Sequence, residues 1–292
     1  MHAAALRLSP PATPGMQAVM ARAGAENFPV ATRLLARADR RHLLAIYGFA
    51  RLADELGDEL EGDRLAALDW LEAELDRAYR GAARHPLLVR LQATLLERTL
   101  PRTAFVRLID ANRLDQRVSR YRTWAQLQSY CRLSANPVGE LVLGVFGLAT
   151  PARIALSDEV CTALQLIEHL QDVGEDLQRG RIYLPEEDLV RFGCTHEQLT
   201  DQGEDFARTA QGLRETIAFE CTRARGLLAG GVPLVAGCAG RPKLALAAFV
   251  AGGRAALEQI ERARTPVLFG VAPAGRVRLA RAFARVLAES RA

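Results

Sequence analysis

Two acidic clusters, far apart in the sequence, hold the residues that could do chemistry. They are residues 54–59 (DELGDE) and residues 172–176 (DVGED). Each places two aspartates at positions i and i+4 of a helix-like pattern, so both carboxylates share one helical face, about 6 Å apart at Cβ. Like charges at that spacing repel, and Mg²⁺, which takes carboxylates, water and substrate phosphates as ligands, would stabilise them. The spacing therefore predicts a Mg²⁺–diphosphate site between two facing helices, with the ligands Asp54, Asp58, Asp172 and Asp176.

A cation and a hydroxyl precede the first cluster on the same predicted helix. Arg51 lies three positions before Asp54, and Tyr47 lies four positions before Arg51. All of them can share a face with Asp58. These groups suit a phosphate that is held partly by metal and partly by direct hydrogen bonds. The alternative is a solvated helix in which Arg51 forms ion pairs with Asp54 and Glu55.

Two arginines and a tyrosine follow the second cluster. Arg179, Arg181 and Tyr183 stand around Gly180, a residue that breaks helices. The alternative to a binding site is a helix C-terminus at which arginines interact favourably with the negative end of the helix dipole. Three acidic residues in the same last turns would work against that dipole. This weakens the alternative.

The combined pattern resembles the squalene/phytoene synthase family. The resemblance is carried by the two Asp-x-x-x-Asp motifs, by Tyr-x-x-x-Arg before the first, and by Arg-Gly-Arg-x-Tyr-Leu-Pro after the second. It runs over residues 26–264. It implies an all-α class I isoprenoid synthase fold, a single helical domain around a central apolar cavity. It also implies that Mg²⁺ held by the facing aspartates draws off diphosphate and generates a carbocation.

Three further segments are similar to the hydroxysqualene synthase branch of that family, which serves bacterial hopanoid biosynthesis. They are residues 26–31, residues 131–139 and the pair Gln171-Asp172. This similarity implies that presqualene diphosphate is ionised and that water captures the cation, giving hydroxysqualene and diphosphate without a nicotinamide reductant. No Gly-rich dinucleotide fingerprint is present, which agrees with this. Two alternatives remain: a prenyltransferase that condenses two prenyl diphosphates head to head, and a non-catalytic helical assembly protein.

The sequence also departs from the usual pattern of the family. Glu55 stands where many relatives have a second Asp. Glu168 lies four positions before Asp172, where an Asn is more common, and it is a further candidate metal ligand. Gln171 replaces the usual Arg and so removes a phosphate-binding cation. His169 adjoins Glu168 in the sequence and is expected to point elsewhere.

Carbocation chemistry needs walls that are apolar and poor in nucleophiles. Residues 138–147 (VGELVLGVFG) are a candidate wall. The segment has three glycines, and each costs a helix up to about 1 kcal/mol relative to alanine. A cavity wall and close packing between helices explain these glycines equally well. Three amides, Asn136, Asn27 and Gln165, are candidates to position the quenching water. The predicted substrate- and diphosphate-binding residues are Tyr47, Arg51, Gln165, Gln171, Arg181, Tyr183, Asn27 and Asn136.

Composition and periodicity predict the elements that must position these residues. The chain of 292 residues is 49% hydrophobic but only 6% aromatic, which favours helix, and apolar residues recur at helical spacing nearly everywhere. We expect one all-α domain over residues 16–292 after a disordered tail at residues 1–15. The predicted helices run over 43–59, from Asp63 towards Tyr79, from Pro86, from Pro101, from Thr123 to near Gly147, from Pro151 to Gly180, and over 201–228, 242–264 and 274–290, with an extended turn at 182–185.

Charge and cysteine content limit the partners. A net charge of +4 is too dispersed to indicate nucleic-acid binding, but it is compatible with an anionic substrate or an anionic membrane surface. The five scattered cysteines form no metal-ligand spacing and indicate reduced thiols. No run approaches the roughly 18 apolar residues of a membrane span. We expect a cytoplasmic protein, with peripheral contact at the inner membrane face left open. Residues 226–240 are either a membrane-facing lip or, as we favour, a buried turn.

Overall fold

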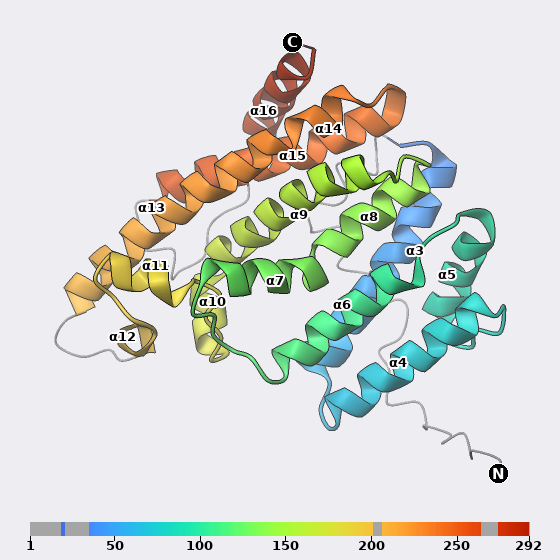
Figure 1. Ribbon diagram of the computed structural model, residues 1–292, viewed down its shortest axis with the longest axis horizontal. Helices are drawn as coiled ribbons and strands as arrows, with labels where there is room; N and C mark the ends of the chain where they lie inside the picture. Colours follow the sequence, from blue (N-terminus) through green and yellow to red (C-terminus); the bar gives the residue numbers. More distant parts are fainter. Residues whose placement is uncertain (1–18, 21–34, 201–205, 264–273, 292) are drawn as a thin grey trace.

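The computed structural model describes residues 19–20, 35–200, 206–263 and 274–291. The predicted tail at residues 1–15, the segment 26–31 and Asn27 lie outside these residues. The described residues form helices joined by short connections (Figure 1). Within them β-pairing is limited to an isolated parallel bridge between Arg120 and Ile182. That bridge accounts for the extended turn predicted at residues 182–185.

The first half of the chain builds a layer of antiparallel helices that carries the first acidic cluster. Local signals set their ends: the Asp63 carboxylate accepts a hydrogen bond from the Ala66 amide at 2.9 Å, and Pro86 occupies the first turn of its helix. Phe49 and Phe105 meet edge to face, with ring centroids 5.0 Å apart, in the core of this half. The elements are α3 (Arg37–Asp54), the π-helix η2 (Glu55–Glu59), α4 (Arg64–Tyr79), α5 (Pro86–Glu97) and α6 (Arg102–Asp115).

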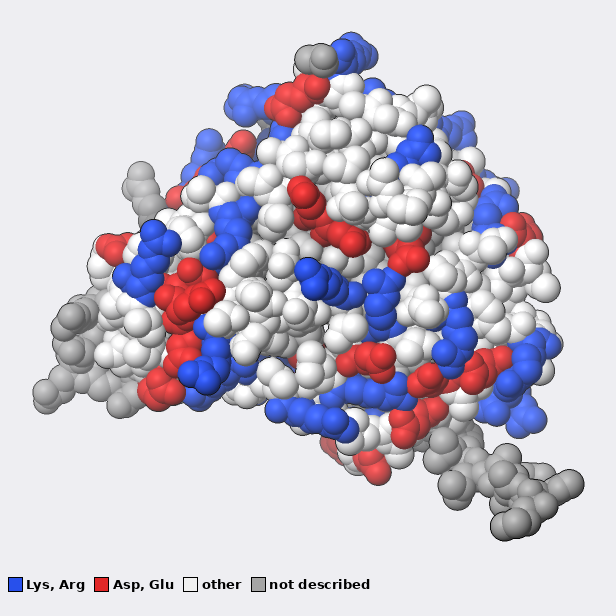
Figure 2. All heavy atoms as spheres, in the orientation of Figure 1, with Lys and Arg blue, Asp and Glu red and all other residues white. Residues whose placement is uncertain are grey.

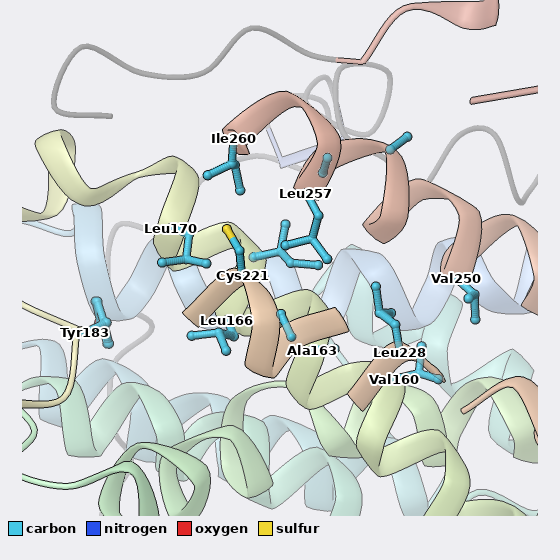
Figure 3. Packing of buried hydrophobic residues seen from close by; sticks show 14 of the residues in the cluster. Val160, Ala163, Leu166, Leu170, Tyr183, Cys221, Leu228, Val250, Leu257 and Ile260 are labelled. Atoms are coloured by element: carbon cyan, nitrogen blue, oxygen red, sulfur yellow. The ribbon is translucent and has the colours of Figure 1, made fainter. Parts of the chain in front are cut away.

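The second half of the chain is organised around α9. Figure 1 shows α9 between α8 on one side and α13 and α15 on the other. The elements are α7 (Trp124–Ser134), α8 (Asn136–Val145), α9 (Pro151–Gln171), α10 (Val173–Gln178), α11 (Glu186–Arg191), α12 (His196–Thr200), α13 (Phe206–Gly230), α14 (Val232–Ala236), α15 (Gly240–Arg262) and α16 (Arg276–Glu289). Figure 3 shows apolar side chains of α9, α13 and α15 meeting between these helices, among them Ala163, Leu228 and Leu257.

Two predicted helices are each divided in the structure. The helix expected from Thr123 to near Gly147 breaks at Ala135, because Pro137, which has no N–H to donate, lies in the first turn of α8. The helix expected to run to Gly180 ends at Gln171, and Asp172 joins it to α10. This break places acidic residues in the first turn of α10, at the positive end of its dipole, rather than in the last turns of a longer helix. Asp172 itself remains at the C-cap of α9.

Residues 226–240 connect α13 to α15, with buried and exposed positions in alternation. They contain the end of α13 and the short helix α14, whose Leu234 and Val235 are buried. We had not predicted α11, α12 or α14, because each is only one or two turns long and has little periodicity of its own. Among the described residues, no helix is both long and apolar enough to cross a membrane.

Candidate active site

All four predicted aspartates line one polar cavity of about 330 Å³. The cavity lies where α3, η2, α6, α7, α8, α9 and α10 meet the segment that follows α10. The two aspartate pairs therefore face the same cavity rather than opposite sides of the molecule. The charged residues of its lining are Arg51, Asp54, Asp58, Asp115, Glu168, Asp172, Asp176, Arg179 and Arg181.

The first aspartate pair is presented by the transition from α3 to the π-helix η2. The Leu60 amide bonds to the Glu55 carbonyl at 3.0 Å, one residue further along the chain than in an α-helix. Asp54 and Asp58 are half-buried on the cavity side, while Leu56 and Gly57 are buried.

Gly57 lets α6 approach η2 closely. A Cβ at this position would lie 2.2 Å from Asn112 Oδ1, so any side chain would push α6 away. Asn112 in turn donates a hydrogen bond from Nδ2 to Asp54 Oδ1 at 3.2 Å. This contact orients the first carboxylate of the pair.

The second pair lies at the junction of α9 and α10. Asp172 is exposed and Asp176 is half-buried, and the Asp176 amide donates to the Asp172 carbonyl at 2.8 Å. Burial, together with the charge of Asp172, raises the pKa of Asp176 to about 7. Burial and the nearby Glu175 also raise the pKa of Asp172. Both carboxylates therefore lack sufficient positive charge nearby.

Arg181 connects the two acidic clusters. Its guanidinium donates to Asp58 Oδ1 at 2.7 Å. Burial disfavours its charge, but the hydrogen bond to Asp58 and the surrounding acids raise the pKa of Arg181 overall. The segment after α10 is thereby held against η2.

A half-buried carboxylate that we did not predict also lines this cavity. Asp115 accepts hydrogen bonds from the hydroxyls of Tyr130 at 2.8 Å and Tyr183 at 3.2 Å. Burial raises the pKa of Asp115 to about 6, against the lowering effect of the Tyr130 hydrogen bond. The spacing of Asn112 and Asp115, three apart on one face of α6, was the available signal in the sequence.

His169 also lines the polar cavity, and the expectation that it points elsewhere was wrong. Its ring stacks on Tyr183, with centroids 3.9 Å apart, and burial lowers its pKa to about 3. The imidazole is therefore neutral. Its Nε2 lies 3.3 Å from Gln165 Nε2. His169 therefore lines the cavity together with its neighbour Glu168 and with Gln165, one turn earlier in α9.

Most of the other predicted binding residues are brought together. Arg51, Gln165, Arg181 and Tyr183 line the polar cavity. Arg51 lies 3.8 Å from Glu55 and 3.9 Å from Glu59, so the ion pair with Glu55 that belongs to the solvated-helix alternative is present.

Two predicted residues lie outside both cavity linings. Tyr47 is buried in α3. Asn136 is buried at the start of α8, where its Oδ1 accepts a hydrogen bond from Thr162 at 3.0 Å. The structure therefore does not place the Asn136 amide where it could hold a quenching water.

An apolar cavity of about 500 Å³ adjoins the polar one. It is enclosed by α8, α9, α14, α15 and the start of α16. From the predicted wall at residues 138–147, only Val138, Gly139 and Val142 line it. Gly139 also serves packing, because a Cβ there would lie 2.3 Å from Ser157 Oγ and 2.6 Å from Cys161 Sγ. Both explanations offered for this segment therefore hold.

Three residues line both cavities and so mark where they join: Val138, Glu168 and Asp172. Gln171 lines the apolar cavity beside them. Within the described residues, no group of three or more His, Cys, Asp or Glu side chains is arranged to hold a metal ion by itself. An ion bound by either aspartate pair would therefore need ligands from water or a substrate phosphate, as Mg²⁺ sites commonly do.

Comparison with known proteins agrees with this geometry. The family model described as squalene/phytoene synthase matches residues 21–282. A hydroxysqualene synthase of Rhodopseudomonas palustris is 39% identical over 215 residues, covering 72% of this chain and 70% of that protein. A phytoene synthase of Arthrospira platensis is 35% identical over 216 residues, 69% of this chain and 68% of that protein.

A solved structure is similar over most of its length. The crystal structure of squalene synthase HpnC from Alicyclobacillus acidocaldarius superposes with a TM-score of 0.77 at 43% identity. The match covers 85% of this chain and 92% of that one. The predicted all-α, single-domain class I isoprenoid synthase fold is thereby confirmed.

Proposed function

The chain belongs to the squalene/phytoene synthase family, and from that premise we propose that it converts presqualene diphosphate and water into hydroxysqualene and diphosphate. The observation that carries the proposal is the joining of the two cavities. A polar space with two aspartate pairs opens at Glu168 and Asp172 into an apolar space of about 500 Å³. A ligand with a diphosphate head and a prenyl tail fits both parts.

The residues of the polar cavity suit Mg²⁺ as a cofactor. Six carboxylates line it against three arginines, and each arginine already has an acidic partner: Glu55 for Arg51, Glu175 for Arg179 and Asp58 for Arg181. A diphosphate would therefore meet a surplus of negative charge. Bound Mg²⁺ would supply the missing positive charge and stabilise the leaving diphosphate.

Each aspartate pair would supply ligands to that metal from its own side of the cavity. Asp54 and Asp58 would ligate from the first helix, and Asp172 and Asp176 from the second. Arg181, already at 2.7 Å from Asp58, is positioned to donate to a phosphate oxygen at the same rim. These residues orient the head of the substrate so that its tail enters the apolar cavity.

The walls of the apolar cavity protect a carbocation from premature capture. Burial raises the pKa of the Cys161 thiol to about 12, so no thiolate is present there near neutral pH. The charged residues of the lining, Glu168 and Asp172, are those that it shares with the polar cavity. A cation formed beside the departing diphosphate is therefore close to the charged border of its binding site.

Gln165 is our candidate for holding the water that is added. It lines the polar cavity, and its Nε2 lies 3.5 Å from Glu168 Oε2 and 3.3 Å from His169 Nε2. Attack of the water oxygen on the cation forms the C–O bond and releases one proton. The Glu168 carboxylate lies within this group and can accept it.

The runner-up is a condensing prenyltransferase, because a phytoene synthase is 35% identical to the chain. The experiment that separates the two supplies purified protein and Mg²⁺ with either presqualene diphosphate or farnesyl diphosphate, in ¹⁸O-labelled water and without a nicotinamide. We expect only presqualene diphosphate to be consumed, giving hydroxysqualene that carries one ¹⁸O by mass spectrometry. Conversion of farnesyl diphosphate alone would support the runner-up. No turnover of either would support a non-catalytic assembly protein.

A further inference from the structure

The outward face of α16 is rich in arginine. The helix carries four arginines, Arg276, Arg278, Arg281 and Arg285, and a single acidic residue, Glu289. Its inward face packs through the buried Ala282 and Val286. Figure 2 shows basic side chains at the top of the molecule, where Figure 1 places α16.

Little of this positive charge is neutralised within the molecule. Arg278 lies 3.6 Å and Arg285 3.9 Å from Glu258, so these two share one acid. Glu289 is paired with Arg254 of α15. Arg276 and Arg281 are exposed and form no ion pair with the described residues.

Small apolar residues lie between these arginines on the exposed surface. Val277 is 77% exposed, and Ala280, Ala284 and Ala288 are exposed along the same side. An exposed face with a shallow apolar strip and arginines on both sides is typical of a helix that lies at a lipid–water interface. A protein partner would require deeper pockets or protruding anchors, which this strip of alanines lacks.

The same helix borders the apolar cavity from the other side. Leu279 and the preceding Ala274 line that cavity. If the chain acts on a prenyl diphosphate, as proposed above, both its substrate tail and its product are partitioned into lipid. A helix that lines the cavity and carries unneutralised arginines on its outer face is well placed between that cavity and a lipid surface.

We propose that this face of α16 docks on an anionic phospholipid surface and brings the apolar cavity next to the membrane. The attraction is electrostatic, with arginines near the lipid phosphates and Val277 at the headgroup level. The inference rests in part on the proposed function, because the lipid character of the substrate is what makes docking useful. The binding itself does not depend on turnover.

The test is sedimentation of the full-length protein with vesicles of phosphatidylcholine and phosphatidylglycerol, without substrate. We expect binding at low salt that is lost in 1 M salt, where the Debye length falls to about 3 Å. The double variant Arg276→Gln/Arg281→Gln should bind roughly thirtyfold more weakly, from about 1 kcal/mol for each basic residue at an anionic surface.

A matched control removes the same charge elsewhere. Arg80 and Arg84 are exposed and form no side-chain ion pair with the described residues, and they follow α4, which Figure 1 places at the opposite end of the molecule from α16. The variant Arg80→Gln/Arg84→Gln should bind vesicles like the wild type, and both variants should keep wild-type turnover of detergent-dispersed substrate.

The proposal would be overturned by wild-type protein that fails to bind the anionic vesicles, by binding of the α16 variant equal to the wild type, or by an equal loss of binding in the control variant. Equal binding to vesicles of phosphatidylcholine alone would also contradict it, because arginine attraction requires an anionic lipid. Failure of the proposed function would leave the vesicle result unchanged and would show only as absent turnover.

Discussion

Gly252 offers a direct test of where the prenyl chain lies. It is in α15 and lines the apolar cavity, and a Cβ built on it meets no atom within 4 Å. A leucine side chain at this position can therefore extend into the cavity without a clash. Its four carbons would displace a similar number of substrate carbons. At about 0.8 kcal/mol for each buried CH₂, the loss is about 3 kcal/mol, or a roughly 100-fold fall in kcat/KM.

The same substitution should stabilise the protein. Glycine in a helix interior is less favourable than alanine by about 0.8–1.0 kcal/mol, and leucine is close to alanine. For a chain of this size, that corresponds to a rise of roughly 2 °C in Tm. Gly252→Leu is thus expected to be more stable and less active than the wild type, a combination that damage to the fold does not produce.

Gly226→Leu is the matched control. Gly226 is exposed in α13, and a Cβ there also meets nothing within 4 Å, but it lines neither cavity. It should gain the same stability and keep the wild-type kcat/KM for presqualene diphosphate. The measurements are scanning calorimetry and steady-state product formation. If Gly252→Leu gains stability and still turns over like the control, the apolar cavity is not the site of the prenyl chain.

Three further outcomes are expected. Asp54→Asn and Asp172→Asn should each lower kcat by at least about 100-fold without lowering Tm, and a variant with near-normal turnover would contradict the metal role of that residue. Mg²⁺ together with pyrophosphate should stabilise the folded protein by about 2.7 kcal/mol when the ligand concentration is 100 times Kd. Tm should rise accordingly, and Asp172→Asn should reduce that rise. Glu220 is buried beside Arg223, which Asp188 already neutralises, and burial raises the pKa of Glu220 from 4.5 to about 8. The folded protein keeps a proton that the unfolded chain releases, so stability present below about pH 4.5 is lost as the pH rises to about 8. Over that range calorimetry should show a larger fall in stability for the wild type than for Glu220→Gln, and parallel curves would refute the assignment.

That the two aspartate pairs share one polar cavity could be predicted because their signals are local. The i, i+4 spacing of the aspartate pairs is a property of one helix each, and it survives both the π-helical turn in η2 and the break at Asp172. The capping signals of Asp63 and Thr123 and the helix-opening Pro86 are likewise local, and the structure has each of them in place.

The hydrogen bonds to Asp115 could not be predicted, because they depend on packing between helices. Asp115 accepts its two hydrogen bonds only when Tyr130 of α7 and Tyr183, after α10, reach it. We predicted that His169 points away from the site because it adjoins Glu168, and that prediction used only its position along one helix. Asn136, a candidate to position the water, lines neither cavity, and its Oδ1 accepts a hydrogen bond from Thr162 of α9.

The charges of the polar cavity also explain why metal and diphosphate should bind together. Without metal, a diphosphate would meet six carboxylates and three arginines that already have acidic partners. Without diphosphate, Mg²⁺ would find at most two carboxylates on each side and would fill its shell with water. Each therefore supplies what the other lacks, which is positive coupling between two ligands. It follows that pyrophosphate alone should leave Tm unchanged and that Mg²⁺ alone should raise it less than the two together. Full stabilisation by pyrophosphate in the presence of a chelator would contradict this reading of the site.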